Sequence, residues 1–119
     1  MLNISYSYFA NNSAAKIAGV AYALNTDVNV TNCTFVNNSA LASDGGVFYF
    51  DCDDTYINKC SYNITNSTFK NNSAYRDGGV IKFTYFKPNI TVNNTFINNT
   101  ASYGPIMASY PVKIVMNDT

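Results

Sequence analysis

The sequence predicts an all-β fold, a parallel β-solenoid of about four rungs, from three observations. One block, Phe-x-Asn-Asn-(Ser/Thr)-Ala, occurs four times in the 119 residues, which indicates a small unit stacked on itself. A glycine-apolar step follows each block at a nearly constant distance. Helical periodicity is absent, and β-branched residues, aromatic residues and Thr flank the blocks. Two or three short strands per repeat, joined by tight bends with Asn and Gly, are typical of a solenoid rung.

The repeats follow one another along the whole chain. Residues 2–9 run directly into the first block at 9–14, and the later blocks lie at 35–40, 69–74 and 96–101. The period is therefore about 26 residues, with seven or eight additional residues between the second and third blocks.

Strand-like sequence lies on both sides of the two inner blocks. It covers 28–35 and 62–69 before the blocks, and 47–50 and 80–86 after the glycine step. The additional residues, at about 51–61, are polar and turn-like, so we predict one inserted loop that leaves the second rung.

The two asparagines of each block are predicted to have different roles. The second can form an internal ladder, because a side-chain amide has both a donor and an acceptor and identical amides can bond rung to rung. Asn also tolerates the left-handed backbone of a tight bend. The Phe rings should stack in the same core, and the step glycines should allow a sharp turn or a close approach between rungs. The predicted ladder contains Asn12, Asn38, Asn72, Asn99, Phe9, Phe35, Phe69 and Phe96, and the predicted turn glycines are Gly19, Gly46, Gly79 and Gly104.

The string Phe-x-x-Asn followed by Gly-Gly-(Ala/Val/Ile) resembles the repeat of the chlamydial polymorphic outer-membrane proteins. Residues 66–80 are also similar to repeats in ciliate surface proteins and in adhesin-like proteins of methanogenic archaea. The resemblance covers essentially the whole chain, and it implies a right-handed parallel β-helix displayed outside the cell. It provides no catalytic residue. The fourth repeat departs from the pattern at 103–111, where the sequence is similar to the variant that closes an array in the ciliate proteins.

Acceptor sequons, Asn-x-(Ser/Thr), are in large excess over random order and predict dense N-glycosylation. The alternative is that the sequons are incidental to the repeat, because the repeated sequence Asn-Asn-Ser-Ala is needed for the fold and happens to contain a sequon. Against this, the sequon falls on the first Asn of each pair, outside the predicted ladder. Rungs about 4.8 Å apart would crowd branched glycans, so partial occupancy by covalent N-glycans is expected. The predicted sites are Asn3, Asn11, Asn29, Asn32, Asn37, Asn63, Asn66, Asn71, Asn89, Asn93, Asn98 and Asn117.

Charge and length limit the partners. Seven basic and seven acidic residues give a net charge of zero, so neither nucleic acid nor an anionic membrane is indicated. No segment has the apolar length of a secretion signal or a membrane span, and we predict a single domain, 1–119, that is a mature piece or fragment of a longer repeat protein. A four-rung stack has two open strand edges, so the predicted partners are copies of the chain in a head-to-tail homopolymer, or neighbouring repeats.

The three cysteines weakly indicate an oxidising compartment. Cys52 and Cys60 flank the inserted loop, and a disulfide between them would restrain it. Cys33 aligns with Ser67 and is expected to pack inward. A bridge from Cys33 to Cys60, or to another subunit, stays open at this point because three cysteines always leave one odd.

Neither an enzyme nor a metal site nor a cofactor is predicted. Some right-handed β-helices process polysaccharides, but a fold does not define a function. The charged residues Arg76, Asp77 and Lys82 show no converging pattern, and there is no His. The densest charged cluster, which is more typical of a solvated loop than of a carboxylate pair or calcium site, contains Asp51, Asp53, Asp54 and Lys59.

Two functional classes remain from the sequence. The first is a structural, glycosylated extracellular module of a fibre or surface appendage. The second is an adhesin or carbohydrate-binding stalk, because tyrosines can stack on sugars, although tyrosines on β surfaces usually pack against cross-strand neighbours. The tyrosines concerned are Tyr6, Tyr8, Tyr22, Tyr49, Tyr75, Tyr85, Tyr103 and Tyr110.

Overall fold

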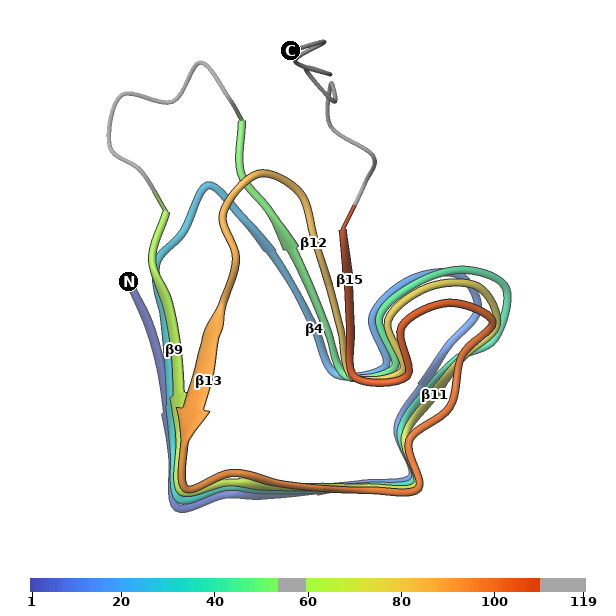
Figure 1. Ribbon diagram of the computed structural model, residues 1–119, viewed down its shortest axis with the longest axis horizontal. Coiled ribbons are helices and arrows are strands. Elements are labelled where there is room, and N and C mark those ends of the chain that lie inside the picture. Colours follow the sequence, from blue (N-terminus) through green and yellow to red (C-terminus); the bar gives the residue numbers. More distant parts are fainter. Residues whose placement is uncertain (54–59, 110–119) are drawn as a thin grey trace, which may run out of the picture.

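The computed structural model describes residues 1–53 and 60–109, so Asp54, Lys59, Tyr110 and Asn117 lie outside the described residues. Within these residues the chain forms fifteen short strands and no helix, which confirms the predicted all-β class. Figure 1 shows the successive rungs lying over one another, with equivalent segments of the chain superimposed.

The rungs repeat one order of strands. The first contains β1 (Leu2–Ser5), β2 (Tyr8–Ala10), β3 (Ser13–Ala14) and β4 (Ala21–Leu24). The second contains β5 (Val28–Thr31), β6 (Thr34–Val36), β7 (Ser39–Ala40) and β8 (Phe48–Asp51). The third contains β9 (Tyr62–Thr65), β10 (Thr68–Lys70), β11 (Ser73–Ala74) and β12 (Ile81–Phe83). The fourth contains β13 (Asn89–Val92), β14 (Thr95–Ile97) and β15 (Met107–Ser109), with an isolated parallel bridge from Thr100 to Ser73.

Equivalent strands of successive rungs pair in parallel and form four sheets that run along the stack. Their strand orders are β1-β5-β9-β13, β2-β6-β10-β14, β3-β7-β11 and β4-β8-β12-β15. The pairing places Phe9 opposite Phe35, and Phe69 opposite both Phe35 and Phe96. The register shifts once, in β13 between Asn89 and Val92. This arrangement confirms the predicted parallel β-solenoid.

Two corners of each rung require a left-handed residue, and seven of the eight are Asn. The corner after the first strand is formed by Tyr6, Asn32, Asn66 and Asn93, with φ between 48° and 56°. The corner after the second strand is formed by Asn11, Asn37, Asn71 and Asn98, with φ between 53° and 60°. Asn visits this region at lower cost than most residues, so the first Asn of each pair makes the bend.

The core between the sheets consists of side chains that stack rung by rung. The rings of Phe9, Phe35, Phe69 and Phe96 form one column with centroids 4.8 to 5.2 Å apart and interplanar angles of 5° to 9°. Phe35 and Phe69 are fully buried, whereas Phe9 and Phe96 in the outer rungs are half-buried. Each inner rung is therefore stabilised by the rungs on both sides of it.

The first position of the glycine step is a left-handed turn. Gly45, Gly78 and Gly104 have φ between 63° and 77°, and Ala18 has φ of 57° at the equivalent position of the first rung. Gly104 was grouped by its sequence with Gly19, Gly46 and Gly79, but the structure places it in this left-handed column. The reason is that the fourth repeat has only one glycine, and the turn requires it more than the close approach does.

The second position of the step is a close approach between rungs. A Cβ on Gly19 or Gly79 would lie 2.2 Å from a carbonyl oxygen of the next rung, and a Cβ on Gly46 would lie 2.0 Å from one. Pro105 holds this position in the fourth rung, since the Cβ direction of Gly79 meets the carbonyl oxygen of Pro105. Glycine is required here wherever another rung follows.

Candidate functional site: the asparagine ladder and the sequon columns

The second asparagines form a continuous ladder through the inside of the stack. The Oδ1 atom of Asn72 accepts from the backbone N–H and from Nδ2 of Asn38, both at 3.0 Å. The Nδ2 atom of Asn72 donates to Oδ1 of Asn99 at 3.0 Å and to the carbonyl oxygen of Phe35 at 3.1 Å. Every donor and acceptor of this amide is thereby paired inside the stack.

The ladder has a direction. Each Oδ1 accepts from the preceding rung, as Asn38 accepts from the backbone N–H and Nδ2 of Asn12 at 3.0 and 3.1 Å. Asn38, Asn72 and Asn99 are buried, whereas Asn12, in the first rung, is exposed. The N-terminal end of the ladder thus presents an acceptor, Oδ1 of Asn12, and the C-terminal end presents the donors of Asn99.

The sequon asparagines lie on the outside of the same rungs. None of the eleven within the described residues is buried, and only Asn29 and Asn32 are half-buried rather than exposed. The structure therefore separates the two asparagines of each block, with the first on the surface and the second in the ladder. Asn117 lies outside the described residues.

Backbone geometry accounts for asparagine in two of the sequon columns. Seven sequon residues are the left-handed corners of the rungs. Asn25 is also left-handed, with φ of 51°, although it belongs to no sequon, so the conformation alone can select this residue type. At these corners the backbone conformation by itself accounts for the asparagine of the sequon.

A third sequon column has no such explanation. Asn3, Asn29, Asn63 and Asn89 lie opposite one another in β1, β5, β9 and β13, where the backbone is extended and Asn is a poor strand former. No amide-to-amide hydrogen bond joins these four residues within the described part of the chain. Asn89 Oδ1 instead accepts from Thr91, and Asn63 Nδ2 donates to Ser61. This column is the clearest candidate for a surface modification.

Cys33 belongs to a second polar column beside the ladder. Its backbone N–H donates to Oγ of Ser67 at 3.1 Å, and the N–H of Ser67 donates to Oδ1 of Asn94 at 3.0 Å. Its Sγ contacts the carbonyl oxygen of Thr31 as Oγ of Ser67 contacts that of Thr65. Cys33 is buried and is not in a disulfide.

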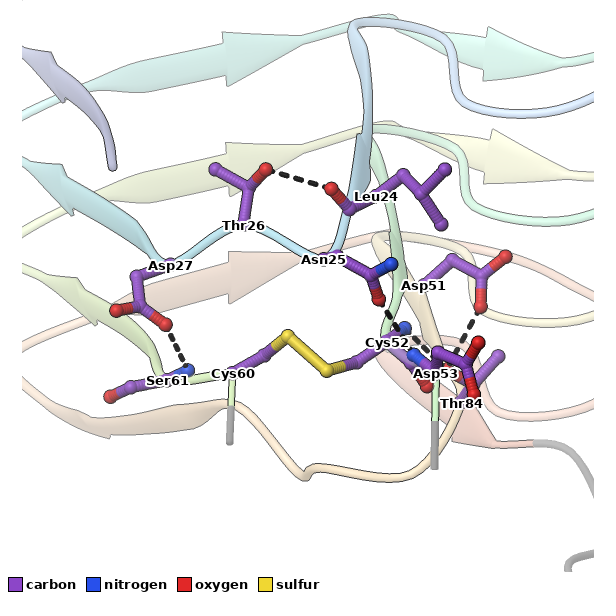
Figure 2. The surroundings of a disulfide bond; sticks show 10 residues. All are labelled: Leu24, Asn25, Thr26, Asp27, Asp51, Cys52, Asp53, Cys60, Ser61 and Thr84. Atoms are coloured by element: carbon purple, nitrogen blue, oxygen red, sulfur yellow. Dashed lines mark hydrogen bonds between the residues drawn. A yellow bond between two sulfur atoms is a disulfide. The ribbon is translucent and has the colours of Figure 1, made fainter. Parts of the chain in front are cut away.

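A disulfide joins the two residues that flank the inserted loop of the second rung (Figure 2). Cys52 and Cys60 are bonded, with Cα atoms 6.2 Å apart, which excludes a bridge from Cys33 to Cys60. The residues beside the bridge are held by the turn of the first rung. Asn25 Oδ1 accepts from the N–H of Asp53 at 2.7 Å, and Asp27 Oδ1 accepts from the N–H of Ser61 at 2.8 Å (Figure 2).

Replacing both bonded cysteines, C52S/C60S, is expected to lower the free energy of unfolding by about 2 to 3 kcal/mol, because a ring closed over a separation of eight residues loses its constraint on the unfolded chain. Urea unfolding followed by circular dichroism measures this. The matched control is C33S, for which Ser67 shows that a hydroxyl fits the column; its midpoint should stay close to wild type. Equal midpoints for the double variant and C33S would contradict the expectation.

The acidic residues of the described chain form structural hydrogen bonds. Asp51 accepts from the hydroxyl of Tyr22 at 2.7 Å and from Oγ1 of Thr84 at 3.2 Å. No group of three acidic, His or Cys residues suited to a metal ion occurs in residues 1–53 and 60–109. A helix able to span a membrane is likewise not found in this described part.

Two buried polar side chains, those of Lys82 and Tyr62, were not predicted from the sequence. Lys82 is only 1% exposed and its Nζ donates to Oδ2 of Asp77 at 2.8 Å, across the step turn, so these residues do converge. The signal was a charged pair five residues apart on either side of Gly-Gly. Tyr62 has a buried hydroxyl, and burial, with smaller effects from Asp51 and Asp27, raises the pKa of Tyr62 to about 12. Its hydroxyl therefore stays protonated at neutral pH.

Fold and ladder together define a repeat protein of the parallel β-solenoid class. The Chlamydia polymorphic membrane protein (Chlamydia_PMP) repeat matches the chain at residues 32–51 and 66–84, in the two inner rungs. Each matched segment begins at a corner Asn and extends through the ladder Asn and the glycine step. No curated protein and no solved structure matches the chain. The match and the stacked parallel strands indicate a repeat protein of the surface or outer-membrane type.

Proposed function

We propose that this chain is a structural, N-glycosylated extracellular β-solenoid module that belongs to a fibre or surface appendage. It stacks end to end with neighbouring repeats or with copies of itself, performs no catalysis and needs no cofactor. The described structure supports a scaffold because the features that recur in successive rungs all hold the rungs together. They are the Phe column, the amide ladder and the close glycine step.

The separation of the asparagines carries this proposal. The ladder amides are consumed by hydrogen bonds inside the stack, while all eleven described sequon residues are accessible from outside. The strand column of Asn3, Asn29, Asn63 and Asn89 keeps a Ser or Thr two residues later in every rung, which neither a left-handed corner nor strand propensity requires. Sugars on this face would also keep a chain of zero net charge solvated.

The acidic residues support a scaffold rather than a catalyst. A glycoside-processing site needs two carboxyl groups that face a substrate. Asp51 and Asp27 instead accept hydrogen bonds from the neighbouring rungs. Their role beside the disulfide is to fasten the strand ends where the loop leaves the second rung.

Secretion of the chain from a eukaryotic cell is expected to give glycoforms that peptide-N-glycosidase reduces to the mass of the bare chain, apart from the conversion of each occupied asparagine to aspartate. Occupancy within one column should be incomplete, because adjacent rungs are about 4.8 Å apart. Mass spectrometry of glycopeptides measures both. The matched control T65A removes the Asn63 sequon and leaves Asn63 in place. Bare asparagines at all described sites would leave only the structural origin of the sequons.

An adhesin is the second candidate, and one feature favours it. Leu41 and Tyr75 occupy equivalent positions of adjacent rungs and are 61% and 68% exposed, and Tyr103 nearby is 73% exposed. Exposed aromatic residues in one region can stack on sugars or contact a partner. Negative-stain imaging of native material, which retains any neighbouring repeat units, separates the candidates: regular filaments support the structural module, whereas discrete particles that bind glycans through Tyr75 support the adhesin.

A further inference from the structure

We infer that the two ends of the solenoid are different: the N-terminal edge accepts a further rung in register, and Pro105 closes the C-terminal edge. This inference rests on the end-to-end stacking in the proposed function. It also decides between the two partners named there, neighbouring repeats and copies of the same chain. The occupant of the N-terminal edge is the C-terminal rung of a neighbouring repeat unit that has glycine at the step, not an identical copy of this chain.

The first observation is the direction of the step Cβ. In three successive rungs the Cβ direction of the step residue points at the carbonyl oxygen of the next rung, at 2.0 to 2.2 Å, and glycine is present each time. Pro105 is the fourth residue of this column. A rung stacked beyond it in the same register would place its own step carbonyl against the Cβ of Pro105, at a distance that no real Cβ tolerates.

The second observation is a missing donor. The N–H groups of Gly19, Gly46 and Gly79 donate to the carbonyl oxygens of Gly45, Gly78 and Gly104 in the next rung, at 3.0 to 3.2 Å. Pro105 has no N–H, so it could not make the equivalent bond to a fifth rung. Proline on an edge is a known means of preventing further strand pairing.

The N-terminal edge has none of these obstacles. β1 pairs with β5 in regular register over all four residues, and nothing in the first rung projects a proline from the step. Leu2 is 36% exposed and Phe9 is half-buried, whereas their equivalents Val28 and Phe35 are fully buried. A further rung would complete the burial of these apolar side chains.

The ladder specifies the chemistry of the occupant. Oδ1 of Asn12 faces the N-terminal end, where the equivalent atoms of Asn38, Asn72 and Asn99 each accept from a backbone N–H and an amide Nδ2 of the preceding rung. The occupant must therefore present an asparagine at the ladder position. Its step residue must be glycine, because its Cβ direction points at the carbonyl oxygen of Gly19.

The first experiment adds such a rung. A second copy of residues 62–87, which has the ladder Asn and a Gly-Gly step, is inserted between Met1 and Leu2 of the full chain, where Leu2 and Tyr62 are equivalent. The melting temperature is expected to rise by at least about 5 °C. N12A should cost more in the extended chain than in the original, because only there does Asn12 accept from a neighbour. An unchanged or lower melting temperature on insertion overturns the open N-terminal edge.

The second experiment opens the other end. P105G is expected to associate head to tail, with a weight-average mass in analytical ultracentrifugation of at least about twice the monomer at high concentration. Wild type and P105A should stay monomeric, because both keep the Cβ; P105A also restores the N–H and so isolates the steric term. Adding wild type should shorten P105G assemblies, since wild type binds by its N-terminal edge and blocks growth with Pro105. The N12A/P105G double variant should associate less than P105G. A monomeric P105G, or wild-type filaments in register, overturns the role of Pro105.

Both experiments use unglycosylated chain, which separates their failure from that of the proposed function. Bare sequons in native material would remove the glycan part of the proposal and leave these results unchanged. If the inserted rung gives no stabilisation and P105G stays monomeric, end-to-end stacking itself fails. If wild type assembles in register, only the difference between the two ends fails.

Discussion

Replacing Gly46 by alanine is expected to lower the free energy of unfolding by at least about 3 kcal/mol, or to prevent folding. The added Cβ would lie 2.0 Å from the carbonyl oxygen of Gly79 and 2.8 Å from that of Ser73. Both contacts are with backbone of the next rung, which cannot move without breaking the parallel hydrogen bonds on either side. Urea unfolding followed by far-ultraviolet circular dichroism measures the loss.

The matched control is P105A, which places alanine at the same step position of the last rung. No described rung lies beyond it, so its stability should stay within about 1 kcal/mol of wild type. The comparison isolates the rung above as the cause. Equal stability of G46A and P105A would show that the stack absorbs a methyl group at the step, and the close approach would lose its significance.

Replacing Asn72 by alanine is expected to cost about 4 kcal/mol. The variant leaves the backbone N–H of Asn38 without the Oδ1 atom that accepts from it, and it removes one amide donor each from the carbonyl oxygen of Phe35 and from Oδ1 of Asn99, which keeps only the backbone N–H of residue 72. All of these groups lie in the buried interior. It also leaves a cavity inside the ladder. The free energy of unfolding from urea titration gives the measurement.

The neighbouring Asn71 supplies the control. It is exposed and left-handed, with φ of 56°, so N71G should be nearly neutral, because Gly adopts this conformation freely. N71A should lose about 1 kcal/mol through backbone strain alone. If N71A destabilised the chain as much as N72A, the two asparagines of the block would not have the separate roles that the structure gives them.

The sequence is informative wherever one rung repeats another. Four copies of the Phe-x-Asn-Asn block predicted the parallel solenoid, because a unit of this size can bury its apolar side only by stacking. The twelve sequons and the two cysteines beside the insertion are likewise visible without coordinates. Aligning the repeats shows which residues occupy equivalent positions, and residues at equivalent positions lie over one another in the core of a solenoid.

Features that depend on the folded path of the backbone were beyond the sequence. Lys82 and Asp77 gave no pattern, yet the turn at the glycine step brings them to 2.8 Å. The sequence also grouped Gly104 with Gly19, Gly46 and Gly79 as one set of turn glycines, because it cannot show to which of two adjacent columns a single glycine belongs. Only the backbone angles and the Cβ directions separate a left-handed turn from a close approach.

The sequence by itself determined that this chain is a stack of similar β rungs with many sequons and one inserted loop. The tertiary structure decided which sequon columns the backbone explains, and to which of two adjacent columns each step glycine belongs. The physical reason is that composition and spacing specify the rung, whereas the direction of a Cβ or an amide toward its neighbour exists only once rungs are stacked. Asn71 and Asn72 have the same side chain. Only their positions around one corner make Asn71 a surface residue and Asn72 a ladder residue.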